Sequence, residues 1–234
     1  MAKKFLGISV TRLLIIAFLV ISLLGPLIAI FINLFSTDLT KIYTSENFLA
    51  SASIATIISV SLAYLLAWAI SRSNIRFKGI IIIAITIPML IPSISHGTGL
   101  VILLGNNGIL KNIFNLNSTI YGLKGIVAGS VMYSFPVAFL MFLDVLKYED
   151  YTLYEVAEVL NIPQKNQFKI ITLTFLKRPL ISITFAIFTM IFTDYGVSLM
   201  VGGRYTTLPL YMYQEVIGLL DYGKGTAIGL ILLI

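Results

Sequence analysis

Residues 125–146 read GIVAGSVMYSFPVAFLMFLDVL, a run of 22 residues in which Asp144 is the only charged one. At a rise of 1.5 Å per residue, an α-helix of this length extends about 33 Å, which matches the roughly 30 Å hydrocarbon core of a bilayer. The run therefore predicts a helix that crosses a membrane.

Four other runs in the chain meet the same length criterion. The five predicted spans lie near Leu13 to Phe35, Phe48 to Ile70, Gly79 to Leu104, Gly125 to Leu146 and Pro179 to Val201. A sixth apolar run opens at Gly225, and ten residues are too few to cross a bilayer, so we expect the last helix to continue beyond Ile234. The predicted fold class is all-α, a polytopic transmembrane helical bundle in which residues 1–234 form a single domain.

The composition excludes an ordinary soluble protein. Hydrophobic residues make up 58% of the chain, charged residues only 11%, and the mean hydropathy is +0.99. The net charge of +6 is spread over loops, so we expect it to orient the bundle and to contact lipid rather than to bind nucleic acid. The chain has no cysteine and a single histidine, His96, so we expect no thiolate or multi-histidine metal site.

Lysine and arginine fall unevenly on the two sides of the predicted bundle. Eleven lie on the side that holds the amino terminus and the segment from Lys147 to Arg178, and five lie on the other. Because positive charge concentrates in cytosolic loops, the amino terminus and this segment are predicted to be cytosolic.

A helical pattern begins soon after Lys147. Thr152 followed by Glu155 fits a capping box and predicts a helix from Leu153, while Glu149 and Asp150 just before it are expected to be solvated charges. Leu153, Val156, Ala157 and Leu160 follow helical spacing, so they are predicted to share one apolar face.

A turn and a second helix are predicted to follow. Asn161 can adopt the left-handed conformation that ends a helix, and Pro163 suits the first position of the next. Phe168 then lies on an apolar face, and Pro179 is expected to open the fifth span. Periodicity alone is equally compatible with an amphipathic connector that lies on the membrane surface.

The order of residues in this segment resembles the cytoplasmic EAA loop of binding-protein-dependent ABC importer permeases. That motif reads E-A-A, then Gly four residues after the second Ala, then I-x-L-P. The corresponding residues here are Glu155-Val156-Ala157, then Asn161, then Ile171-Thr172-Leu173-Thr174. Val156, Asn161 and Thr174 depart from the family pattern, although Asn tolerates positive φ better than most residues.

The resemblance implies a type I ABC importer permease (MetI-like) fold, with six helices in the full protein, in the bacterial plasma membrane. It further implies that the segment docks on a cytosolic ATPase dimer, which binds ATP and magnesium, and that a second permease subunit and an extracytoplasmic solute-binding protein complete the importer. The implied ATPase-coupling residues are Glu155, Val156, Ala157, Leu160, Asn161, Pro163 and Phe168.

The chain itself is not expected to be an enzyme. Residues 218–225 nearly match a phosphate-binding P-loop, but Gly225 stands where a Ser or Thr must coordinate magnesium, and no strand precedes the segment. We therefore expect no catalytic residue and no cofactor in this chain.

Asp194 lies about 22 Å beyond Pro179 in the fifth apolar run, where a buried charge costs several kcal/mol. It either lines the translocation pathway or serves a structural role. The residues around it resemble permeases for iron(III), thiamine, polyamines and aminoethylphosphonate or phosphonate, so one of these solutes is expected.

Two other functional classes compete with the importer. A self-sufficient secondary transporter or channel needs its own ion relay, usually with several intramembrane charges, whereas Asp194 is the one well-placed acid in the predicted spans. A membrane scaffold that does not transport would use the cytosolic helices only as a binding surface.

Overall fold

The computed structural model describes residues 2–35, 47–115 and 119–233, and this described part consists of helices and their connections, without a strand. The predicted all-α class is confirmed. The elements are α1 (Ala2–Phe35), α2 (Asn47–Arg72), α3 (Lys78–Thr86), η2 (Ile87–Leu90), α4 (Ser93–Leu104), α5 (Ile109–Phe114), α6 (Leu123–Lys147), α7 (Thr152–Val159), α8 (Gln164–Gln167), η3 (Phe168–Thr172), α9 (Leu173–Phe192), α10 (Gly196–Val201), α11 (Leu208–Tyr213), η4 (Gln214–Gly218) and α12 (Tyr222–Leu233).

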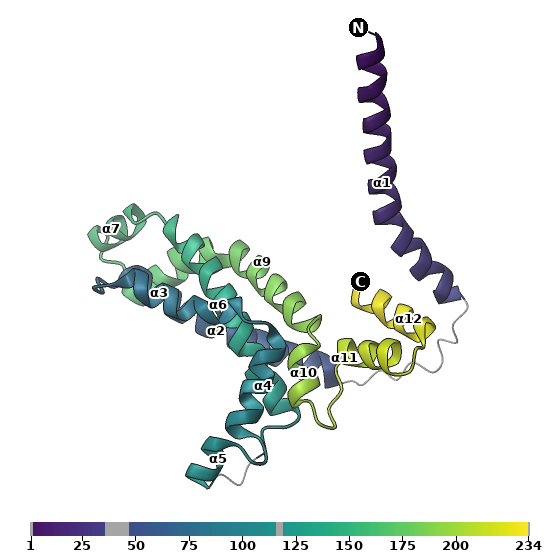
Figure 1. Cartoon of the computed structure of the whole chain (residues 1–234). Coiled ribbons are helices and arrows are strands. Elements are labelled where there is room, and N and C mark those ends of the chain that lie inside the picture. The colour runs from purple at the N-terminus through teal and green to yellow at the C-terminus, as the bar shows by residue number, and fades with distance from the viewer. Residues whose placement is uncertain (1, 36–46, 116–118, 234) are drawn as a thin grey trace. The chain divides into compact units, whose positions relative to one another are not determined.

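The chain forms two compact units. One comprises Met1–Thr44 with Tyr211–Ile234, and within it α1 packs against α12. In this unit Glu215 is buried and accepts a hydrogen bond from Lys224 Nζ at 3.3 Å, so the lysine of the P-loop-like stretch is held in an ion pair. The other unit, Ser45–Leu210, contains α2, α6 and α9 side by side (Figure 1).

Several helices are long enough to cross a membrane. Within the described residues, Leu49–Arg72, Leu123–Lys147 and Gln164–Phe192 have the required length and hydropathy, and the bent pair Lys78–Leu90 and Ser93–Phe114 can make a fourth span. Shorter apolar helical stretches run over Val10–Ser22 and Tyr222–Leu233. The structure thus describes a multi-pass membrane protein.

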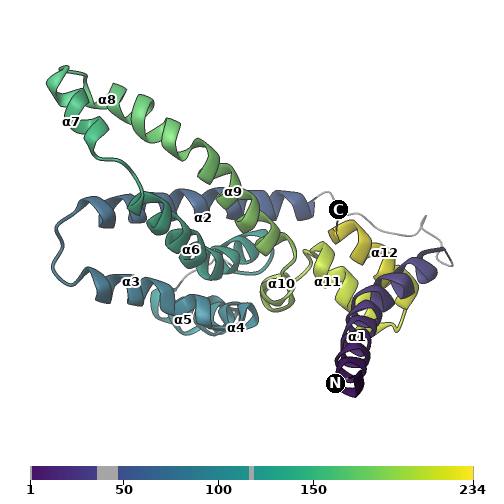
Figure 2. The same ribbon diagram turned by 90° about the horizontal axis from the view of Figure 1, so that it is seen from above.

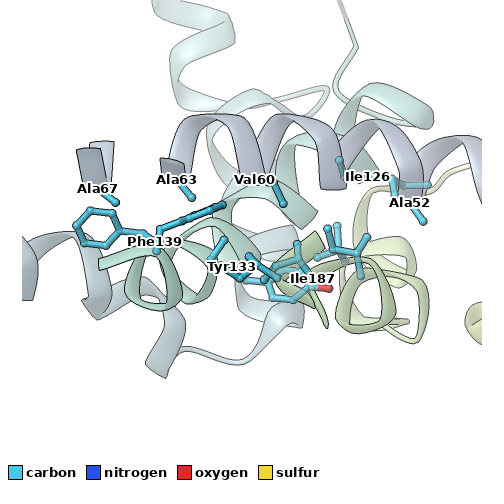
Figure 3. Close-up of a cluster of buried hydrophobic side chains, with 14 of the residues drawn as sticks. Ala52, Val60, Ala63, Ala67, Ile126, Tyr133, Phe139 and Ile187 are labelled. Atoms are coloured by element: carbon cyan, nitrogen blue, oxygen red, sulfur yellow. The ribbon is translucent and has the colours of Figure 1, made fainter. Parts of the chain in front are cut away.

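Small residues let α2 and α6 pack closely. Ala55, Ser59, Ala63 and Ala67 recur every fourth position of α2 and are completely buried. Figure 3 shows Ala63 and Ala67 close to Phe139 of α6. Ser59 and Ser134 share a hydrogen bond of 2.7 Å across the two helices. In lipid, such small-residue faces and interhelical hydroxyl contacts hold helices together where water supplies no hydrophobic force.

The third predicted span is not one straight helix, and this corrects the interpretation of Gly79 to Leu104. The two halves are bent by 96°. Ile91 is extended with φ −94° and ψ 133°, and Pro92 follows with ψ 144°. Proline forces the preceding residue out of the helical region and lacks an amide donor, so the pair ends one helix and begins another.

The fifth predicted span also has different limits. The helical run begins at Gln164, continues without interruption through Pro179, and ends at Phe192. Pro179 therefore lies inside α9 and does not open the span, since membrane helices tolerate an internal proline. The predicted end at Val201 was wrong as well, because a non-helical break at Asp194 separates α9 from α10.

Candidate functional site

α7 begins at Thr152, and its amino terminus corrects the predicted capping box. Tyr151 is the capping residue and supplies no side-chain hydrogen bond. Instead Asp150 Oδ1 accepts hydrogen bonds from the Thr152 amide at 3.0 Å and from the Thr152 hydroxyl at 2.8 Å. The Thr152 hydroxyl thus donates to the Asp150 carboxylate. Both hydrogen bonds from Thr152 lower the pKa of Asp150.

The carboxyl end of α7 confirms the predicted turn. Asn161 has φ 52°, the Asn161 amide donates to the Glu158 carbonyl at 2.9 Å, and the Ile162 amide donates to the Ala157 carbonyl at 2.9 Å. This is the Schellman arrangement that satisfies the last carbonyls of a helix. Pro163 caps α8 and is not its first residue, because its carbonyl accepts the first helical amide bonds.

The residues of the predicted apolar face of α7 differ in their exposure in the structure. Ala157 is 4% exposed and packs inward, whereas Leu153, Val156 and Leu160 are 52%, 55% and 65% exposed. Val159, outside the predicted face, is the most exposed at 82%. α7 and α8 lie together at the end of the unit farthest from α10 (Figures 1 and 2). An eight-residue helix thus presents exposed apolar side chains.

Beneath α7, four polar side chains from four segments form a connected cluster, the Arg72 network. Arg72 Nη2 donates to Glu149 Oε2 at 2.9 Å and to the Tyr154 hydroxyl at 2.7 Å. The Tyr154 hydroxyl lies 2.5 Å from both Glu149 Oε1 and Thr172 Oγ1. The network joins the end of α2, the α6–α7 connection, α7 itself and η3, so α7 cannot shift without disturbing these bonds.

The Arg72 network contradicts the expectation that Glu149 is a solvated charge. The Glu149 side chain is only 2% exposed and its carboxylate forms an ion pair with Arg72. The guanidinium in turn lies over aromatic rings, 4.4 Å from the Tyr154 centroid and 5.5 Å from that of Tyr151. Burial raises the pKa of Tyr154, and the hydrogen bond with Glu149 adds to the shift.

The network forms one wall of a cleft of about 520 Å³. Two predicted coupling residues, Glu155 and Phe168, line it. The full lining is Trp68, Arg72, Tyr151, Tyr154, Glu155, Glu158, Gln164, Gln167, Phe168 and Thr172. The structure thus brings Glu155 and Phe168 to a common hollow, while Val156 and Leu160 remain on the open surface.

Asp194 is half-buried at the break between α9 and α10. Its Oδ2 accepts the Val197 amide at 3.0 Å, and its Oδ1 accepts the hydroxyl of Ser93 at the start of α4. The carboxylate therefore caps α10 and ties it to α4. Asp194 forms no ion pair with any residue that the structure describes.

The fold of the chain is similar to that of ABC transporter chains of known structure. The chain superimposes on a subunit of a bacterial alginate ABC transporter, solved in complex with a periplasmic protein bound to alginate pentasaccharide, with a TM-score of 0.72. The match covers 98% of this chain and 89% of that one at 14% sequence identity. A second structure of a bacterial ABC transporter that imports alginate gives a TM-score of 0.65 at 15% identity, covering 98% and 90%.

Sequence comparison gives more particular relatives, although no protein-family model matches the chain. The chain is 27% identical over 180 residues to the thiamine transport system permease protein ThiP of Haemophilus influenzae, and 23% identical over 146 residues to ThiP of Brucella suis. These matches cover 74% and 59% of this chain but 34% and 27% of the relatives. The chain thus spans between about a quarter and a third of their length. The resemblance to binding-protein-dependent ABC importer permeases is confirmed.

Proposed function

We propose that this chain is a transmembrane permease subunit of an ATP-driven ABC importer in the bacterial inner membrane, and that α7 docks on a separate cytosolic ATPase. The observation that carries the proposal is the apolar surface formed by Leu153, Val156 and Val159 of α7 and by Leu160 directly after it, outside the spanning segments. Exposed apolar patches of this kind mark sites where a partner binds.

A partner protein explains this surface better than a membrane does. Helices that lie on membranes carry lysine and arginine on the polar face, which attract anionic lipid headgroups. α7 reads TLYEVAEV, so its charged residues are Glu155 and Glu158, and it has no basic residue. A protein groove that is apolar with a basic rim would complement it.

The Arg72 network supports the mechanical part of the proposal. A docking helix transmits force only if it is held firmly by the transmembrane helices, and the hydrogen bonds of Tyr154 connect α7 to both α2 and η3. Because η3 continues directly into α9, a displacement of α7 would move two spanning helices together. Movement of this kind would open or close a pathway between permease subunits.

The remaining parts of the importer follow from the same proposal. ATP and magnesium would be bound by the partner ATPase dimer, a second permease subunit would complete the pathway, and an extracytoplasmic binding protein would deliver the solute. Thiamine is the first solute to test, because the relatives found by sequence are thiamine permeases. Iron(III), polyamines and phosphonates are the next candidates.

The test is Val156→Asp in cells that express the complete importer. Val156 is 55% exposed, so the variant should fold normally while a charge at the docking surface reduces ATPase copurification and thiamine uptake at least tenfold. Ile75→Asp is the matched control, because this β-branched residue is 44% exposed on the loop between α2 and α3. Copurification and uptake that persist in the Val156 variant would disprove the docking role.

A further inference from the structure

A small cavity lies beside Asp194. Its volume of about 10 Å³ corresponds to one water-sized body, and it is formed by residues of α2, α6, the α9–α10 junction and α11. The polar residues that line it all carry oxygen. They are Asp194, Ser51, Ser130, Ser198 and Thr207.

Thr207 provides independent evidence that the cavity holds a bound water or ion. The residue is only 7% exposed, and its Oγ1 is buried without a hydrogen-bond partner. A buried hydroxyl without a partner costs about 1–3 kcal/mol, and such groups in native proteins are usually satisfied by a bound water or ion. Because Thr207 lines the cavity, an occupant there would be in position to bind this oxygen.

The charge of Asp194 indicates which kind of occupant is needed. Its carboxylate receives hydrogen bonds only from neutral donors, the Ser93 hydroxyl and the Val197 amide, and within the described residues no lysine or arginine pairs with it. A carboxylate that is partly removed from water and receives hydrogen bonds only from neutral donors is stabilised by a nearby cation. One negative charge among hydroxyl oxygens calls for a single positive charge.

We propose that this cavity is a sodium-binding site, with Asp194 and Thr207 as ligands and the serine hydroxyls completing the coordination. The donor set contains oxygen alone, which excludes the transition metals that prefer nitrogen or sulfur. Calcium requires six to eight oxygen ligands and usually several carboxylates, and magnesium requires a nearly ideal octahedron, so a monovalent ion fits one carboxylate best. Bound sodium would hold α10 against α6 and the end of α9.

The first experiment is a thermal unfolding series on the full purified chain in detergent, with sodium chloride exchanged for choline chloride at constant ionic strength. Sodium should raise Tm saturably, by about 5 °C at a hundredfold excess over Kd, and choline should not. Potassium should give a smaller rise. Equilibrium binding of radioactive sodium should approach one ion per chain.

Two variants separate a sodium ligand from a structural group. Asp194→Asn should abolish the sodium-specific rise, and Asp144→Asn, an exposed acid on α6, should keep it. Thr207→Val removes an oxygen that has no protein partner, so Tm in choline should stay unchanged or increase while the rise with sodium is lost. Thr189→Val, on an exposed site of α9, should respond to sodium as the parent chain does.

A bound water would give a different result. If sodium, potassium and choline produce the same Tm, or if the Thr207 and Asp194 variants retain the full sodium response, the cavity holds water and the proposal fails. ATPase docking at α7 is measured separately by copurification, so neither outcome bears on the proposed function.

Discussion

Two carboxylates flank α9, and their surroundings differ. Glu149 connects through Tyr154 to Thr172, directly before α9, and Asp194 follows the helix shortly after Phe192. Glu149 is buried and has an arginine partner, whereas Asp194 is half-buried and has neutral donors alone within the described chain. A carboxylate paired with an arginine of the same chain keeps its counter-charge. A carboxylate without such a partner can bind and release a cation from solution. The two ends of α9 are therefore expected to respond differently to mutation.

Arg72→Met should have the largest effect, because it leaves the Glu149 carboxylate buried without its cation. Loss of one partner of a buried pair costs about 3 kcal/mol or more, and this should appear as a lower free energy of unfolding in mixed micelles. Arg76→Met, which removes an exposed arginine on the loop after α2, is the control and should cost little.

The double variant Arg72→Met with Glu149→Leu sharpens this prediction. Removal of both charges should restore a large part of the lost stability, since an apolar pair can replace a buried ion pair. If the single variant is as stable as the parent chain, the ion pair does not hold the end of α2, and the contrast with Asp194 disappears.

Tyr154→Phe should have an intermediate effect of about 1.5 kcal/mol, because its hydroxyl contacts Arg72, Glu149 and Thr172. Tyr148→Phe, on an exposed tyrosine, should be nearly neutral. Equal stability of the two variants would mean that the Tyr154 hydroxyl does not link the helices.

The same substitution predicts a pH dependence. The pKa of Tyr154 is raised in the folded chain above the ordinary value of 10.0. Below pH 10 both folded and unfolded chains keep the phenol proton, so its contribution is complete; above pH 10 the unfolded chain ionises first and stability decreases. The parent chain should therefore lose more stability than Tyr154→Phe between neutral pH and pH 11, and parallel unfolding curves would contradict this.

Asp194→Asn should have the smallest effect on the free energy of unfolding. Measured without sodium, the loss should be below about 1 kcal/mol. An asparagine oxygen can still accept the Ser93 hydroxyl, and asparagine caps helices about as well as aspartate. Ser93→Ala in the same buffer tests the hydroxyl contact alone. A loss as large as that of Arg72→Met would show that the Asp194 charge has a fixed structural partner.

Local sequence rules predicted much of the fold. Apolar length located the spans formed by α2 and α6, and the preference of asparagine for positive φ located the turn at Asn161, whose φ is 52°. The proline rules explain the break near Pro92, although apolar length alone predicts Gly79 to Leu104 as one span. Pro179 was predicted to open the fifth span, but it lies inside α9, because membrane helices accept an internal proline when neighbouring groups support the backbone.

The candidate site was harder to predict, since its key contacts join residues far apart in sequence. Arg72 and Glu149 are 77 positions apart, and periodicity carries no information about such pairs. The sequence offered a weak signal, because Arg72 lies two residues after the predicted span that ends at Ile70, and Glu149 lies three residues after the one that ends at Leu146. Thr152 misled the capping prediction because Asp150, two residues earlier, competes for its hydroxyl.

The chain contains a single tryptophan, and it lies in the cleft beside α7. Trp68 is 40% exposed, and the Arg72 guanidinium lies 5.9 Å from its ring centroid. Indole emission depends on solvent exposure and on nearby charge, so fluorescence excited selectively at this residue reports on the cleft without any label. A blue shift on addition of an ATPase that carries no tryptophan would record docking in real time, and a stopped-flow trace would give its rate.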